Sequence, residues 1–113
     1  MFKLPVPIHH ELDGGRYIGT ACAVITQDPD SGWINAGTYR IQVVEPDVGM
    51  CYISPGKHGR LHRDKYFERG LPCPAVAVVG IDPSCSWPLV IKCRRGFQSL
   101  IGSAACENNR WKF

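Results

Sequence analysis

The sequence contains no long apolar run, no N-terminal export pattern and no Cys-x-x-Cys pair, which mark membrane, secreted and many disulfide-rich proteins. No stretch approaches the roughly 20 apolar residues that a membrane-spanning helix needs. Residues 1–10 lack the basic and then apolar segments of a secretory signal. Internal repeats and low-complexity segments are also absent. We therefore expect a soluble, cytoplasmic protein that does not span a membrane.

Cysteine is frequent, although no spacing pattern organises it. Without an export signal, the thiols are expected to meet a reducing compartment, in which disulfides are rare. Reduced cysteine packs as a small hydrophobic residue, so we expect mostly buried thiols rather than a disulfide framework. The six cysteines are Cys22, Cys51, Cys73, Cys85, Cys93 and Cys106.

The chain is long enough for one modest core. It has 113 residues, of which 44% are hydrophobic, and this fits a single domain over residues 1–113. The net charge of +3 is unevenly distributed: residues 1–56 carry three Lys/Arg and six Asp/Glu, whereas residues 57–113 carry ten and four. A basic half either faces an anionic partner or forms a solvated surface, and composition does not choose between these.

Runs of β-branched and small residues predict a mainly β domain of the α+β class, in which three consecutive strands pair in antiparallel order. The expected strands cover residues 17–26, 33–44 and 50–54, and turn-forming sequences at 28–32 and 45–49 separate them.

One helix is predicted over residues 59–69, with Leu61, Tyr66 and Phe67 as the side chains that face the core. Gly70 follows at the position of a helix C-cap glycine. Beyond the helix, a continuous apolar run is typical of a strand buried on both faces. That run covers residues 75–79, and residues 89–91 are the remaining strand candidate.

Two short segments hold most of the side chains that could carry chemistry. Residues 35–40 read Asn-Ala-Gly-Thr-Tyr-Arg, and residues 54–59 read Ser-Pro-Gly-Lys-His-Gly, with His58 eighteen residues after Arg40. The two segments therefore place an amide, a guanidinium and an imidazole on neighbouring extended pieces of chain.

Strand geometry limits how the first segment can act. Side chains five apart point to opposite faces of a regular strand, and Asn35 and Arg40 would lie roughly 16 Å apart. One metal ion cannot use both, but an elongated cofactor can if a bulge redirects one side chain. Gly37 lies between them, and a strand glycine commonly marks either a bulge or a close aromatic ring.

Both motifs, together with residues 13–18 and 26–32, closely resemble the UbiD family of decarboxylases, which use prenylated flavin mononucleotide. The resemblance covers roughly residues 5–83 and implies the N-terminal part of the cofactor-binding domain, a partial split β-barrel with one helix. Residues 84–113 do not follow the family pattern and form a divergent tail.

The resemblance also implies roles for individual residues. Asn35 and His58 correspond to ligands of a manganese ion that bridges to the cofactor phosphate, with potassium as a further candidate ion. Arg40 corresponds to the catalytic arginine at the flavin ring and the substrate carboxylate, a task that suits the permanent charge and planar fork of guanidinium. The implied cofactor contacts are Thr38, Tyr39, Arg40, Cys51, Tyr52, Ile53, Lys57 and Gly59.

If Arg40 binds a substrate carboxylate, it should have no carboxylate partner within the chain. It should also point into a cleft lined by Tyr39, Tyr52 or Lys57. The alternative is a surface ion pair with Glu45 or Asp47, which would contribute little to stability.

The activity that the resemblance implies is reversible non-oxidative decarboxylation of an aromatic or α,β-unsaturated carboxylic acid. The family's proton-donating carboxylate and third metal-binding carboxylate are not recognisable, and Glu107 is the one carboxylate after Asp82. Two protein ligands hold a hard divalent cation poorly. We therefore expect a truncated chain, a small subunit or a degenerate relative, inactive alone and associated with itself or with a chain that supplies the rest.

Three other interpretations remain open. The chain could be a non-catalytic flavin-binding or interaction subunit that pairs through open sheet edges. The basic residues 57–65 could contact nucleic acid, but Asp64 and Glu68 interrupt the run and no known module follows, so no nucleic-acid partner is expected. A zinc site would use residues whose spacings match no strong pattern. They are His9, His10 and His62 with Cys51 or Cys73.

Overall fold

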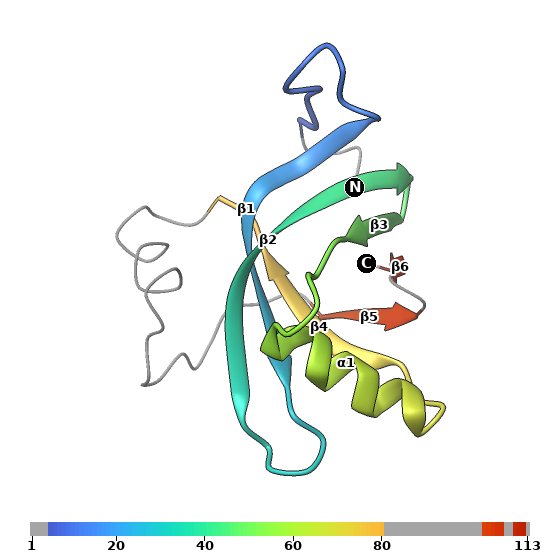
Figure 1. The fold of residues 1–113 in the computed structure, drawn as a ribbon. Helices are drawn as coiled ribbons and strands as arrows, with labels where there is room; N and C mark the ends of the chain where they lie inside the picture. Colours follow the sequence, from blue (N-terminus) through green and yellow to red (C-terminus); the bar gives the residue numbers. More distant parts are fainter. Residues whose placement is uncertain (1–4, 81–102, 108–109, 113) are drawn as a thin grey trace.

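The computed structural model describes residues 5–80, 103–107 and 110–112, which form a mainly β fold with one helix, as predicted (Figure 1). Two long strands form a hairpin that runs the length of the molecule, and the helix lies beside the end that holds the hairpin turn. The elements in chain order are β1 (Arg16–Gln27), β2 (Ile34–Glu45), β3 (Val48–Cys51), α1 (His58–Glu68), β4 (Cys73–Val78), β5 (Ser103–Glu107) and β6 (Arg110–Lys112).

The described strands curl into a barrel in the order β1-β2-β3-β6-β5-β4, in which β4 returns to pair with β1. All pairs are antiparallel, which confirms the predicted order of the first three strands. Every described strand has two neighbours, so no described strand lies at an end of the sheet. Pairing is uneven, however, because β3 pairs only with residues 41–45 of β2. Along residues 34–40, β2 pairs with β1 on one edge and with no described strand on the other.

The register between β1 and β2 is regular around Gly37, which lies opposite Val24. The irregularities lie in β1 instead, where two residues between Gly19 and Cys22 face the single residue Arg40. The prediction of an irregularity in β2 at Gly37 is therefore wrong. A Cβ added at Gly37 would lie 2.7 Å from Tyr39 Cε2. The glycine thus allows the aromatic ring to lie over the strand, which was the alternative explanation.

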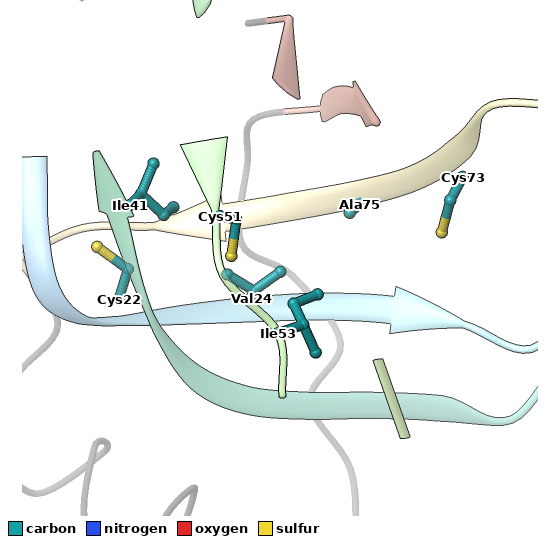
Figure 2. Packing of buried hydrophobic residues seen from close by; sticks show 7 residues of the cluster. All are labelled: Cys22, Val24, Ile41, Cys51, Ile53, Cys73 and Ala75. Atoms are coloured by element: carbon teal, nitrogen blue, oxygen red, sulfur yellow. The ribbon is translucent and has the colours of Figure 1, made fainter. Parts of the chain in front are cut away.

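The core lies inside the barrel (Figure 2). There, inward-facing side chains of β1, β2 and β4 pack against Cys51 of β3 and against Ile53, which comes just after β3. Val24 and Ile41 are fully buried. Cys22, Cys51 and Cys73 are also buried, as expected for thiols that pack as small hydrophobic residues. Burial raises the pKa of the Cys22 thiol, because the anion would lose its hydration.

Helix α1 ends as the sequence predicts. Gly70 has φ +67°, its N–H donates to Phe67 O at 2.9 Å, and Leu71 N–H donates to Tyr66 O at 3.0 Å. This pair of hydrogen bonds is the Schellman motif, which needs a residue that tolerates positive φ. Tyr66 and Phe67 pack against the core as predicted, but Leu61 is 50% exposed. The most buried positions of the helix are Gly59, His62 and Arg63.

Strand β4 overlaps the predicted apolar run at residues 75–78 but is not buried on both faces. Cys73 and Ala75 are buried, whereas Pro74 is exposed, so its first half alternates between core and solvent. Strands β5 and β6 lie in residues 84–113, where the sequence predicted no strand other than 89–91. Residues 89–91 themselves lie outside the described residues. In the described part of the chain, no helix is long and apolar enough to cross a membrane.

Candidate functional site

The candidate site lies where the first turn of α1 packs against the inward face of β2. Asn35, Gly37 and Tyr39 share this face because they are two residues apart. A Cβ added at Gly59 would lie 3.1 Å from Tyr39 Oη and 3.7 Å from Asn35 Nδ2. The glycine that follows His58 therefore lets the helix terminus approach the strand closely.

The polar atoms of this contact are only partly satisfied. Burial raises the pKa of the Tyr39 hydroxyl, while a backbone hydrogen bond with Gly59 acts in the opposite direction. The nearby Asn35 side chain lowers the pKa of this hydroxyl more than Gly59 does, although the Asn35 Nδ2 atom has no hydrogen-bond partner in the described part of the chain. Asn35 Nδ2 is buried and has no hydrogen-bond partner among the described residues. A buried amide without a partner costs free energy, so this is a position where a bound group would be stabilising.

The N-terminus of α1 has no side-chain cap. Lys57 is the N-cap residue, its backbone is extended, and its side chain makes no capping hydrogen bond. The first turn contains no acidic residue. Lys57 and His58 are both exposed. The terminal N–H groups and the positive end of the helix dipole are therefore compatible with an anion such as phosphate.

Trp33 and His62 belong to the same region, although the motif comparison did not assign them a role. The Trp33 ring lies 4.9 Å from the His58 ring and 5.5 Å from the His62 ring, nearly perpendicular to both. His62 is buried, and its Nδ1 lies 3.0 Å from Thr26 Oγ1. Burial lowers the pKa of His62, partly offset by the negative charge of Asp28. The signal available in the sequence was the spacing of the two histidines, since residues four apart share one face of a helix.

The β1–β2 turn is tied to the same helix by ion pairs. Lys65 Nζ donates to both carboxylate oxygens of Asp28, at 2.8 and 3.0 Å, and lies 3.0 Å from Asp30 Oδ2. Arg69 also donates to Asp30. Hydrogen bonding from Lys65 is the main reason that the pKa of Asp28 is lowered to about 2. Together, Asp28, Asp30, Lys65 and Arg69 hold the turn against α1, and we call them the turn clamp.

Arg40 lies on the other face of β2, as the parity of the strand predicts. Its side chain is exposed, and within the described residues it forms no ion pair, with Glu45 and Asp47 included. Thr38 shares the outward-facing parity. The structure therefore separates the predicted site into an inward group at the helix terminus and an outward group around Arg40.

The remaining predicted contacts differ in accessibility. Tyr52 is 67% exposed, whereas Cys51 and Ile53 are buried in the core. Because their side chains are buried, Cys51 and Ile53 could contact a cofactor only through their backbone. The cofactor-binding roles of these residues stay predictions.

The two other site interpretations find little support. The residues considered for zinc do not assemble, since no group of three or more His, Cys, Asp or Glu within the described ranges could hold a metal ion. Most of the Lys and Arg side chains in residues 57–65 contact other residues of this chain. Arg63 is buried over the Phe67 ring at 5.5 Å, Arg60 lies 3.7 Å from Asp64, and Lys65 belongs to the turn clamp.

Residues 1–100 match the UbiD family, described as a 3-octaprenyl-4-hydroxybenzoate carboxy-lyase Rift-related domain. The chain is 32% identical over 82 residues to pyrrole-2-carboxylic acid decarboxylase of Pseudomonas aeruginosa. The matched segment covers 73% of this chain and 16% of that protein.

Two solved structures resemble the fold. One is an evolved dimeric form of the UbiD-class enzyme HmfF from Pelotomaculum thermopropionicum in complex with prFMN, at 38% identity and a TM-score of 0.67, covering 72% of this chain and 18% of that one. The other is vanillic acid decarboxylase of Sedimentibacter hydroxybenzoicus in closed form, at 28% identity and a TM-score of 0.72. That match covers 77% of this chain and 19% of the other. The chain thus spans less than a fifth of the length of these relatives.

Proposed function

The chain belongs to the UbiD family, and on that basis we propose that it is the N-terminal part of a prenylated-FMN-dependent carboxy-lyase. Its substrate would be an aromatic or α,β-unsaturated carboxylic acid. The observation that carries the proposal is the buried Nδ2 of Asn35, an unpaired donor suited to a phosphate oxygen, beside an uncapped helix terminus. The chain spans less than a fifth of its relatives, so the active unit would also need residues beyond the 113 of this sequence.

We propose that the residues at the helix terminus bind a phosphate and a divalent cation. Asn35 and His58 would bind Mn²⁺, with K⁺ as a further ion, since a carboxamide oxygen and an imidazole are both accepted metal ligands. The N–H groups at the start of α1 and the Lys57 ammonium would bind the phosphate. Gly59 keeps this approach free of a side chain, and Tyr39 lies beside it.

Around the ring system, the proposal assigns contacts to both sides of β2. Arg40 would contact the cofactor by its side chain, and the backbone around Thr38, Cys51, Tyr52 and Ile53 would line it. When bound, prenylated FMN supplies the electronic chemistry of carbon–carbon bond cleavage.

Arg40 is the residue of this chain proposed to act directly on the substrate. Its exposed guanidinium, without an ion-pair partner among the described residues, can bind a carboxylate through two parallel hydrogen bonds and remains charged throughout. Such binding holds the carboxylate in one orientation before it leaves. The subsequent proton transfer needs a donor that this chain does not recognisably contain. We therefore propose that the isolated chain is inactive, because general acid catalysis contributes about 10²–10⁴-fold to such rates.

A non-catalytic flavin-binding subunit is the second candidate function. It would use the same cofactor site and would bind its partner at the one edge of β2, residues 34–40, that lacks a described strand. The two functions differ in whether a complementing chain restores decarboxylation.

Equilibrium dialysis of the purified chain against FMN with MnCl₂ tests the cofactor site. We expect FMN retention to depend on Mn²⁺ and to be lost in Asn35→Ala. Ile34→Ala is the matched control, because Ile34 is exposed on the opposite face of the same strand. Equal retention by both variants, or none by the unmodified chain, would contradict the proposal.

A further inference from the structure

We propose that Trp33 is a positioning residue for His58, holding the imidazole in the orientation in which it serves the helix-terminus site. The identity of the ion that His58 binds rests on the proposed function. The ring contact itself does not, because it is a property of the folded chain.

The first observation is how little else restrains His58. The residue is exposed, and its ring makes no hydrogen bond to any residue in the described part of the chain. Histidine ligands in proteins usually have a hydrogen-bonded partner that fixes the ring. Here the restraint on the ring is the near-perpendicular contact with Trp33 at 4.9 Å and 81°. Aromatic rings attract one another in this arrangement at such distances.

The second observation is that Trp33 is itself held in place. Its ring also contacts His62 at 5.5 Å and 90°, and His62 is buried and hydrogen-bonded to Thr26. The backbone carbonyl of Trp33 accepts a hydrogen bond from Asp28 N–H at 2.8 Å. About half of the Trp33 surface is exposed. Even so, the Trp33 backbone is held by its hydrogen bond with Asp28, and the neighbouring His62 ring is held by its hydrogen bond with Thr26.

The third observation is that the strand end and the helix are tied together next to this contact. The turn clamp joins the β1–β2 turn to α1 through Lys65 and Arg69, which are one and two turns beyond His62. Trp33 follows the turn and His58 begins the helix, so the clamp fixes the two backbones that carry the two rings. The contact is thus a consequence of the fold rather than of one flexible side chain meeting another.

These contacts predict that replacing Trp33 releases the His58 ring without unfolding the chain. The expected effect on metal binding is about tenfold weaker Mn²⁺ affinity, which is the lower end of the effect of removing residues that orient metal ligands. Trp33→Leu removes the aromatic contact, Trp33→Phe keeps part of it, and Ile34→Leu is the matched neighbouring control.

The test uses NMR of the full chain with isotope-labelled histidine, and His58→Gln assigns the His58 signals. Without metal, Trp33→Leu should shift the ring resonances of His58 and His62, because both lose the ring current of the indole. Those of His9 and His10 should stay unchanged. Trp33→Phe should give intermediate shifts, and Ile34→Leu none. Unchanged His58 resonances in Trp33→Leu, with a native-like spectrum elsewhere, would overturn the inference.

A titration with MnCl₂ alone then separates this inference from the proposed function. Mn²⁺ should broaden the His58 signals of the unmodified chain, and Trp33→Leu should need about ten times more Mn²⁺ for the same broadening. Equal titrations of the two proteins would overturn the positioning role. Absence of any broadening in the unmodified chain would contradict the proposed metal site, and the metal-free shifts would still decide whether Trp33 contacts His58.

Discussion

Gly37→Ala should destabilise the chain through a single clash. The added Cβ would lie 2.7 Å from Tyr39 Cε2, 2.7 Å from its Oη and 2.9 Å from its Cζ, closer than such atoms approach. The Tyr39 ring, packed against the core, would have to move away from Gly59. Overpacking of this kind costs about 1–3 kcal/mol, and replacing a strand glycine by alanine returns about 0.5–1 kcal/mol. The expected net loss lies between about 0 and 2.5 kcal/mol, centred on about 1 kcal/mol.

A double-mutant cycle measured by urea unfolding tests this cause. In a Tyr39→Leu background the ring is absent, so Gly37→Ala should be neutral or slightly stabilising. The coupling energy should then be about 1–3 kcal/mol. In thermal unfolding, the single variant should melt about 4–8 °C lower for each kcal/mol lost. Equal effects of Gly37→Ala in both backgrounds would refute the explanation, because the loss would then come from something other than the Tyr39 ring.

Three further predictions concern the elements that support the site. The pKa of Asp28 is lowered from 3.8 to about 2, so its contribution to stability is complete above about pH 4 and lost as the pH falls toward 2; Asp28→Asn should remove this part of the acid dependence of urea unfolding. Gly70→Ala should lower stability by about 1–2 kcal/mol because φ is +67°, whereas Gly14→Ala, also in open space, should have no effect on the melting temperature. Thr26→Val leaves the buried Nδ1 of His62 without its partner and should cost about 1–3 kcal/mol, and an unchanged denaturation midpoint would contradict that hydrogen bond.

Local chemistry allowed much of the fold to be predicted. The predicted strand at 17–26 is observed as Arg16–Gln27 and the one at 33–44 as Ile34–Glu45, because turn-forming residues separate them. Helix α1 is shifted by one residue from the prediction, and Gly70 ends it for the predicted reason.

Features that depend on distant pairing could not be predicted in the same way. Closure of the barrel requires β3 to pair with β6 and β4 with β5, and no local pattern encodes these partners. The buried face of α1 carries His62 and Arg63 rather than Leu61, because the hydrogen bond to Thr26 and the contact with Phe67 outweigh apolar patterning. The apolar pattern therefore placed Tyr66 and Phe67 correctly and Leu61 wrongly.

The candidate site was predictable in composition but not in arrangement. Strand parity correctly placed Asn35 and Arg40 on opposite faces. The bulge that was expected to bring them together is absent at Gly37, and the irregularity opposite Arg40 belongs to β1. The contact between Trp33 and His58 joins two elements 25 residues apart, so only the folded arrangement reveals it.

The most direct test of the central claim is co-expression of the 113-residue chain with a flavin prenyltransferase. The purified protein would then be examined by absorbance spectroscopy and native intact mass. The proposal predicts a bound modified flavin in the unmodified chain and in Ile34→Ala, and none in Asn35→Ala. A chain that purifies without flavin under these conditions, or an Asn35→Ala variant that retains it fully, would contradict the claim that residues at the start of α1 and on β2 form a prenylated-FMN site.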